Sequence, residues 1–245
     1  MKKEFVTMGM PARIEVVDPH VREKDIDEII EYFDSIDRRF STYKQDSELS
    51  RINAGAISPD QYSKDMQTIF ALCEQTRLET NGYFDIHSNT ILDPSGLVKG
   101  YAIWQASQQL QNKGYMNTYV EIGGDIQVFG TDQHHTPWAI GIRNPFQKDE
   151  IIKVVHLIDA GIATSGTSER GTHIYDPIHK KDADEIASIT VIAPSVYDAD
   201  RYATAAFAMG ENGISWINDQ PGYEGYAVTK DKRGVYTNGF SSYVH

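Results

Sequence analysis

The segment 198–210 carries a carboxylate and a hydroxyl four positions apart, at Asp200 and Thr204. Residues at i and i+4 lie on the same face of a helix, so these side chains would project next to each other. Magnesium takes oxygen ligands and often binds only one or two protein groups, while phosphates and water complete its shell. The pair is therefore a candidate for half of a magnesium site. By itself the pair also fits a simpler role, in which Asp200 complements the helix N-terminus and Thr204 bonds back to a carbonyl.

A second candidate is the segment 95–102, where Lys99 lies between two glycines at the expected start of a helix. Backbone N–H groups at a helix N-terminus can bind an anion, and the lysine would add a point charge. The P-loop pattern of Gly-x4-Gly-Lys-Ser/Thr does not occur at this position. The alternative is a glycine turn followed by a solvated lysine.

Two further segments concentrate polar residues near glycines. The paired glycines of 121–125 let the backbone approach a ligand, or form a type I′ hairpin turn. The segment 163–177 gathers several hydroxyls, an arginine and His173, a combination suited to holding a diphosphate and moving a proton near neutral pH. A single histidine is more often structural than catalytic, so both interpretations stay open here.

Composition excludes several classes of protein. The formal net charge of -12 argues against a nucleic-acid-binding surface, which needs a basic face. Cys73 is the only cysteine, so the chain has neither an internal disulfide nor a cysteine metal cage. Serine-hydrolase and zinc-protease signatures are missing from the sequence. We find no signal peptide, lipid anchor or membrane-length apolar run and expect a cytoplasmic protein, although an exported chain with its leader removed would look the same.

The hydrophobic pattern predicts helices early in the chain and strands late. Apolar spacings of three and four predict helices over about 21–40, 47–53, 60–80 and 98–112, after one long or bent strand over 4–17. Short β-type runs follow over 119–122, 125–129, 138–142, 151–157 and 186–193. The Asp200 helix, a helix over about 213–219 and two strands near 226 and 235 complete the chain. This order favours an α+β fold with a mainly antiparallel sheet, and no domain boundary is evident.

Taken together, these segments resemble a known family. Eight motifs occur in the order found in the ApbE family of FAD:protein FMN transferases. They are Met-Gly-Met at 8–10, Ser-Thr-Tyr-x-x-Asp-Ser-Glu-Leu-Ser-x-x-Asn at 41–53, Gly-x-Phe-Asp at 82–85, Val-Lys-Gly-Tyr-Ala at 98–102, Ile-Gly-Gly-Asp at 122–125, Thr-Ser-Gly at 164–166, His-Ile-x-Asp-Pro at 173–177 and Asp-x-x-x-Thr at 200–204. Each motif is modest by itself, but eight in order are specific.

The resemblance implies a fold and an activity. The fold would be a T-fold-like α+β structure in which residues 1–245 form one ApbE-like flavin transferase domain. The activity would be a magnesium-dependent transfer of FMN from FAD to a threonine or serine hydroxyl of an acceptor protein, through a phosphoester bond and with release of AMP. Two alternatives remain, namely an FAD pyrophosphatase that uses water as its nucleophile, and a flavin-binding module without catalysis.

The resemblance also implies site residues. The metal would be held by the backbone carbonyl of Gly96 together with Asp200 and Thr204, and catalysis would use His173, Asp200 and Lys99. FAD contacts would fall on Met8, Ser41, Thr42, Tyr43, Asp85, Lys99, His173 and Ile186. His173 could orient the diphosphate or accept the proton of the acceptor hydroxyl. Position 96 is glycine where other members often have alanine, which matters little if only its carbonyl binds metal.

Overall fold

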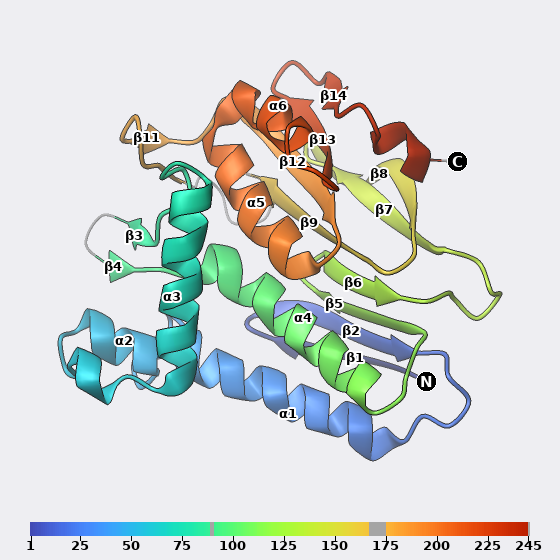
Figure 1. Cartoon of the computed structure of the whole chain (residues 1–245), viewed down its shortest axis with the longest axis horizontal. Helices are drawn as coiled ribbons and strands as arrows, with labels where there is room; N and C mark the ends of the chain where they lie inside the picture. The colour runs from blue at the N-terminus through green and yellow to red at the C-terminus, as the bar shows by residue number, and fades with distance from the viewer. Residues whose placement is uncertain (89–90, 167–174, 245) are drawn as a thin grey trace.

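An antiparallel sheet of eight strands forms the centre of the protein (Figure 1). The structure is a computed structural model that describes residues 1–88, 91–166 and 175–244. In spatial order the strands are β1 (Lys2–Thr7), β2 (Met10–Val16), β5 (Thr118–Ile122), β6 (Asp125–Phe129), β9 (Ala160–Gly166), β12 (Ile186–Ala193), β13 (Glu224–Thr229) and β14 (Gly234–Tyr236). Neighbouring strands run antiparallel at each junction of this sheet, which confirms the predicted α+β class.

Helices cover one face of the sheet, and a β-hairpin packs on the other. The helices are α1 (Glu23–Phe40), α2 (Glu48–Asn53), α3 (Lys64–Glu79), α4 (Ser95–Asn112), α5 (Val196–Ala208) and α6 (Gly213–Asn218), with short 3₁₀ turns at Pro59–Gln61, Gly210–Asn212 and Phe240–Tyr243. Figure 1 shows α1, α4 and α5 lying across the sheet. The opposite face packs against the hairpin of β7 (Trp138–Asn144) and β8 (Gln147–Leu157). None of the described helices is both long enough and apolar enough to cross a membrane.

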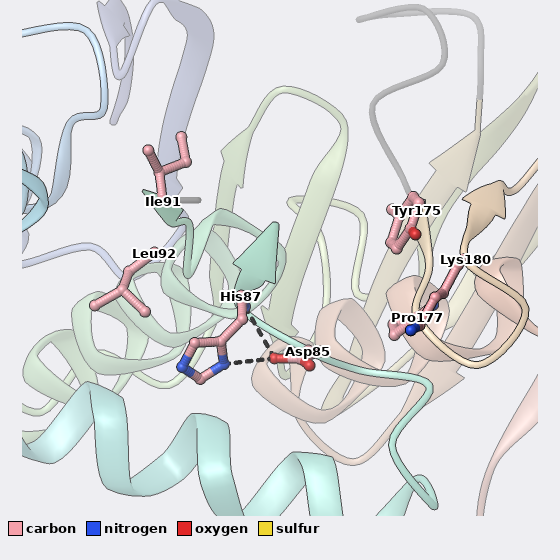
Figure 2. Close-up of a pocket in the computed structure, with 7 residues that line it drawn as sticks. All are labelled: Asp85, His87, Ile91, Leu92, Tyr175, Pro177 and Lys180. Atoms are coloured by element: carbon pink, nitrogen blue, oxygen red, sulfur yellow. Dashed lines mark hydrogen bonds and ion pairs between the residues drawn. The ribbon is translucent and has the colours of Figure 1, made fainter. Parts of the chain in front are cut away.

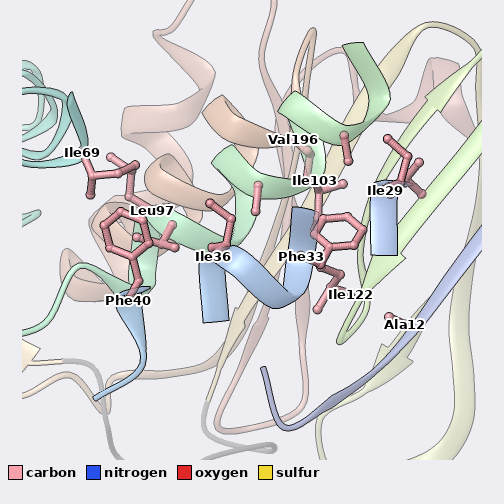
Figure 3. Close-up of a cluster of buried hydrophobic side chains, with 14 of the residues drawn as sticks. Ala12, Ile29, Phe33, Ile36, Phe40, Ile69, Leu97, Ile103, Ile122 and Val196 are labelled. Carbon is pink, nitrogen blue, oxygen red and sulfur yellow. The ribbon is translucent and has the colours of Figure 1, made fainter. Parts of the chain in front are cut away.

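The largest apolar cluster joins α1 and α4 to the sheet (Figure 3). Phe33 and Ile36 from α1 meet Ile103 from α4, while Ile122 reaches the cluster from the sheet. Val196, at the first turn of α5, belongs to the same cluster. This packing fixes where the first turns of α4 and α5 lie, because both helices bury their apolar faces in one core.

The predicted helices are present with small differences at their ends. The helix predicted over 21–40 begins at Glu23, and that over 98–112 begins earlier, at Ser95. Ser47 caps α2 by accepting the Ser50 N–H at 2.9 Å, in agreement with the predicted short capped helix. The helix predicted over 60–80 begins at Lys64, because a proline-initiated 3₁₀ turn comes before it.

The prediction of one bent strand over 4–17 is wrong. Strands β1 and β2 form a two-residue hairpin, in which Thr7 pairs with Met10. Met8 and Gly9 occupy the turn with φ values of 50° and 73°, as a type I′ turn requires. The sequence here is Met-Gly in place of the Asn-Gly or Asp-Gly that usually marks such a turn. Because methionine rarely takes positive φ, the turn could not be predicted.

Strand β9, at the centre of the sheet, was not predicted. Its residues are mostly small and lack the alternation of a typical strand. The reason lies in the helix above it: a Cβ atom on Gly161 would lie 1.9 Å from the backbone nitrogen of Val196. Small side chains therefore let the start of α5 rest directly on the sheet. Two short hairpins were also missed, β3 (His87–Ser88) with β4 (Ile91–Leu92), and β10 (Tyr175–Asp176) with β11 (Lys181–Asp182).

Candidate functional site

The site begins where α4 and α5 pack closely against each other. Gly96 and Gly100 lie on one face of α4, opposite the α5 face that carries Val196, Asp200 and Thr204. A Cβ atom on Gly100 would lie 2.6 Å from both the Asp200 Cβ and the Val196 carbonyl oxygen. Glycine is therefore required at position 100 for this approach. This close approach brings the backbone of α4 within hydrogen-bonding distance of side chains on α5.

The three predicted metal ligands meet at this contact. Asp200 is 5% exposed, and its Oδ2 accepts the Gly100 N–H at 2.7 Å. Thr204 Oγ1 donates to the Gly96 carbonyl oxygen at 3.3 Å, although the two residues are 108 positions apart. The structure thus brings together the carboxylate, the hydroxyl and the carbonyl that the sequence singled out. Their role as ligands stays a prediction.

The simpler roles considered for Asp200 and Thr204 are wrong. Ser195 caps α5, because its Oγ accepts the Asp198 N–H at 3.1 Å, and Asp200 lies farther inside the helix. The Thr204 hydroxyl is directed toward the neighbouring helix. Neither side chain is explained by the local needs of α5.

Lys99 is also not the solvated lysine of the alternative interpretation. Its side chain is 18% exposed, and its Nζ lies 2.6 Å from Asp125 Oδ2. Asp125 is 1% exposed, and its Oδ1 accepts the Thr164 N–H of β9 at 3.1 Å. Asp125 was missed as a site residue, although it ends one of the recognised motifs.

The paired glycines explain how Asp125 reaches the site. Gly123 and Gly124 have φ values of 60° and 92° and form a type I′ turn, in which Ile122 pairs with Asp125. The hairpin interpretation of these glycines is therefore the right one. The turn places the Asp125 carboxylate at the first position of β6, on the sheet face that the helices cover. An acidic residue at the first position of a buried strand was the sequence signal that could have identified Asp125.

Electrostatics set this cluster apart from the rest of the core. Burial, together with the Asp125 carboxylate beside it, raises the pKa of Asp200 to about 8, and the Lys99 ammonium only partly opposes this rise. The raised pKa means that Asp200 holds a proton much of the time near neutral pH, and a cation that displaces this proton would meet two carboxylates against one ammonium. Such a cluster favours a cation, and its oxygen donors suit a hard one.

The donor set also limits the kind of metal. Among the described residues, no three His, Cys, Asp or Glu side chains gather into a metal-binding group. A cation here would be held by one carboxylate, one hydroxyl and one carbonyl. Magnesium fits this arrangement, because it keeps positions for phosphate oxygens and water.

A cavity of about 460 Å³ opens between the two short hairpins (Figure 2). Its lining residues are Asp85, His87, Ile91, Leu92, Tyr175, Pro177 and Lys180. Asp85 Oδ1 lies 2.8 Å from His87 Nδ1 and accepts the His87 backbone N–H at 2.9 Å. Figure 2 shows this pair facing Tyr175, Pro177 and Lys180 across the cavity.

The cavity is linked to the start of α4 through chain neighbours of its lining residues. Phe84, beside the lining residue Asp85, would lie 3.4 Å from a Cβ atom on Gly96. Asn53 holds the other wall, since its side chain donates to the Leu92 carbonyl at 3.0 Å and accepts the Leu92 N–H at 2.8 Å. The final asparagine of the 41–53 motif thus positions a wall of the cavity.

The other predicted FAD contacts are distributed unevenly. The Ser41 carbonyl is held by the hydroxyls of Ser47 and Ser50, Thr42 is half-buried, and Tyr43 is 87% exposed. Met8 lies in the β1–β2 turn, next to the turn that precedes Asp125, because the Gly123 N–H donates to the Pro11 carbonyl at 2.9 Å.

Of the predicted residues that the structure describes, Ile186 is not brought to this site. The Ile186 side chain is buried beneath α5 and lines a separate cavity of about 160 Å³. His173 lies outside the described residues.

The fold and the site define an α+β protein with an oxygen-rich candidate cation site at the start of a helix and a cavity beside it. Comparison with known families gives this class a name. The sequence profile of the ApbE family matches residues 8–92 and 87–227, so the chain belongs to the ApbE family.

Two similar proteins align with most of this chain. The FAD:protein FMN transferase of Haemophilus influenzae is 24% identical over 306 residues, which covers 97% of this chain and 88% of that protein. The FAD:protein FMN transferase of Vibrio cholerae is 27% identical over 256 residues, covering 80% and 75%.

Solved structures share the fold. The ApbE protein of Thermotoga maritima superposes with a TM-score of 0.87 at 22% identity, covering 100% of this chain and 99% of that one. The flavin transferase ApbE from Vibrio cholerae gives a TM-score of 0.84 at 21% identity, with the same coverage.

Proposed function

We propose that this chain is an FAD:protein FMN transferase that uses Mg²⁺, and that residues 1–245 act as one transferase domain. One observation carries the proposal: the Gly96 carbonyl, the Thr204 hydroxyl and the Asp200 carboxylate meet beside Lys99 at the start of α4. The names of its relatives and the adjoining cavity support FAD as the substrate.

The residues present fit a magnesium ion, since they offer a buried carboxylate, a hydroxyl and a carbonyl as hard oxygen donors. Gly96, Thr204 and Asp200 would hold the ion. When bound, it would neutralise charge on the diphosphate of FAD and stabilise the leaving group. Lys99 would add a fixed positive charge at the same diphosphate, because the packing of α4 and its ion pair hold it in place.

The transfer step exchanges one phosphorus–oxygen bond for another. The hydroxyl oxygen of an acceptor serine or threonine attacks the phosphorus on the FMN side of the diphosphate. The bond from that phosphorus to the bridging oxygen breaks, AMP leaves with the bridging oxygen, and FMN stays on the acceptor as a phosphoester. The hydroxyl proton passes to a base. His173 is the candidate for this role or for orienting the diphosphate.

The test uses the full chain with FAD, MgCl₂ and an acceptor peptide of Asp-x-x-Ser-Gly-Ala-Thr type. We expect a flavin mass adduct on the peptide and one AMP per adduct. Free FMN and AMP without an adduct would instead establish the pyrophosphatase. FAD binding without either product would reduce the chain to a flavin-binding module.

His173 has its own test. The variant His173→Ala is expected to be nearly inactive yet still able to bind FAD, because its proposed role lies in turnover. A normal transfer rate would reduce this histidine to a structural part of its segment.

A further inference from the structure

Asp125 is the one charged residue of the described cluster to which the sequence assigned no role. It joins three elements, since its carboxylate contacts Lys99 of α4 at 2.6 Å and the Thr164 N–H of β9 at 3.1 Å, while it opens β6 itself. Its Oδ2 is shut off from solvent. A buried carboxylate is unfavourable unless it is paired, so its charge needs an explanation beyond the turn.

The turn does not require a charge. An asparagine at position 125 would have nearly the same shape and could still accept the Thr164 N–H through its amide oxygen. Asparagine also suits the residues around a type I′ hairpin turn. The local backbone therefore explains a polar side chain at this position but not a carboxylate.

The charge is explained by Lys99. Without Asp125, the ammonium of Lys99 would be the nearest strong charge to Asp200 and would oppose a cation at the Asp200 oxygens. With Asp125, the lysine is balanced and held by a short ion pair, and the Asp200 carboxylate is left to pair with the cation. Lys99 can then serve the diphosphate without displacing the metal.

We propose that Asp125 is a positioning residue, which fixes Lys99 by its ion pair and balances the lysine charge so that the site accepts a divalent cation and an anionic diphosphate together. The proposal rests on the proposed function. Asp125 would therefore affect the binding of two ligands of opposite charge, the Mg²⁺ ion and the diphosphate of FAD.

The test measures binding to the full chain in two ways. Calorimetric titration of MgCl₂ into the protein with saturating FAD gives the metal affinity, and titration of FAD in EDTA gives the metal-free affinity. For Asp125→Asn we expect Mg²⁺ affinity to fall by about 10- to 100-fold, as for other residues that support a metal site. Metal-free FAD should bind at least as tightly as to wild type, because the Lys99 ammonium is no longer paired with a carboxylate and its charge can act on the diphosphate.

A charge-restoring double variant separates this role from simple loss of structure. Lys99→Met with Asp125→Asn removes one charge of each sign, so the net charge of the cluster returns to that of wild type. We expect its Mg²⁺ affinity to recover to within a few fold of wild type, although two native side chains are gone. A residue with a purely structural role would show no recovery.

The matched control is Gln127→Leu. Gln127 lies on the same strand and accepts the Val196 N–H at 2.7 Å, so its loss disturbs the packing of α5 without changing a charge. It should lower the melting temperature but leave the ratio of the two affinities unchanged.

Two failures are distinguishable. If wild type binds FAD and Mg²⁺ but Asp125→Asn keeps full Mg²⁺ affinity, or loses metal-free FAD affinity in parallel, the role of Asp125 is refuted. If wild type itself fails to bind FAD with Mg²⁺, the proposed function fails first. Should Asp125→Asn not fold, the double variant carries the comparison, since it buries no unbalanced ammonium beside position 125.

Discussion

The backbone N–H of Gly100 donates a hydrogen bond to the Asp200 carboxylate at 2.7 Å, across the contact between α4 and α5. The bond forms only because position 100 has no side chain: a Cβ atom there would lie 2.6 Å from the Asp200 Cβ. A main-chain donor thereby orients the candidate metal ligand. The relationship ties the shape of the helix contact to the chemistry of the site.

Gly100→Ala is therefore expected to harm both stability and activity. The added methyl group also meets the Val196 carbonyl oxygen at 2.6 Å, and backbone cannot turn aside as a side chain can. Overpacking of this kind costs about 1–3 kcal/mol. Thermal denaturation and the FMN-transfer rate measure the two effects, and a variant with both values near wild type would contradict the close contact.

Gly96→Ala provides the contrast. The three atoms nearest to its added methyl group would all belong to side chains, namely Thr204 Cγ2 at 2.9 Å, Thr204 Oγ1 at 3.0 Å and Phe84 Cε2 at 3.4 Å. Side chains can give way by a few tenths of an ångström more readily than backbone, so the Gly96 carbonyl and the Thr204 hydroxyl can stay close to their places. We expect a smaller loss of both melting temperature and transfer rate than for Gly100→Ala.

Asp200→Asn separates stability from function. The amide keeps the shape of the carboxylate and can still accept the Gly100 N–H, while a buried charge beside Asp125 is removed. In EDTA the variant should be at least as stable as wild type, yet Mg²⁺-dependent transfer should be abolished. Unchanged transfer by this variant would refute the metal site.

Thr204→Val tests the hydroxyl in the same way. Valine has nearly the same volume but loses the 3.3 Å bond to the Gly96 carbonyl, which costs about 1 kcal/mol. The transfer rate should fall by at least about 10-fold, the range seen when metal-site residues are altered. Thr204→Ser keeps the hydroxyl and is expected to retain most of the activity. Equal losses in both variants would show that the methyl group matters as much as the hydroxyl, and would contradict a special role of the hydroxyl.

Pairs of neighbouring side chains could be predicted from the sequence when both lie on one helix or strand, but not when they lie on different elements. Asp200 and Thr204 could be paired because helical spacing places them on one face. Asp125 could not be paired with Lys99, because their contact depends on how β6 lies under α4. The Gly96 carbonyl was named only through the family resemblance, since backbone atoms leave no trace in residue type.

Local backbone conformation set the other limit. Met8 at φ 50° turns what looks like one strand into a hairpin, and no local signal marks a methionine for that conformation. The composition of β9 is determined by its contact with α5 rather than by strand propensity. The packing of α5 at Gly161 excludes the larger residues that are typical of strands. Both misses arise where tertiary contacts override local preference.

The Asp25 carboxylate makes the stability of the folded protein depend on pH in the acidic range. Arg22 donates to it at 2.7 Å, Tyr115 at 2.5 Å and Lys113 at 3.2 Å, and these donors, Arg22 first, hold its pKa well below the ordinary value of 3.8. Because the folded state holds the charged form, this stabilisation is present above about pH 4 and is lost as the pH falls below it.

Asp25→Asn should therefore lower the melting temperature at pH 7, and its difference from wild type should shrink as the pH falls from about 5 toward 2. Melting curves across this pH range measure the effect. Asp27→Asn is the matched control, because Asp27 is exposed on the same helix and pairs only at the surface with Lys3. A constant difference between Asp25→Asn and wild type at every pH would contradict the assignment.

Arg201 joins α5 to the end of α3 and should affect stability without affecting the metal. Its guanidinium is buried, donates to Asp198 at 2.7 Å and pairs with Glu79, and it stacks 4.2 Å from the centre of the Tyr202 ring. Removing one partner of a buried ion pair costs about 3 kcal/mol or more. For Arg201→Met we expect a loss of this size in the free energy of unfolding, because methionine replaces the apolar stem but leaves two carboxylates without their cation.

The control for Arg201 lies on α3. Arg77 pairs with Glu74 at 2.7 Å on the exposed surface, where such pairs contribute about 0–1 kcal/mol. Urea denaturation should thus separate Arg201→Met clearly from Arg77→Met. Arg201 follows Asp200 in the chain but contacts α3, whereas Asp200 contacts α4, so folded Arg201→Met should bind Mg²⁺ and FAD as wild type does. Weakened Mg²⁺ affinity in the folded variant would show that this cluster also positions Asp200.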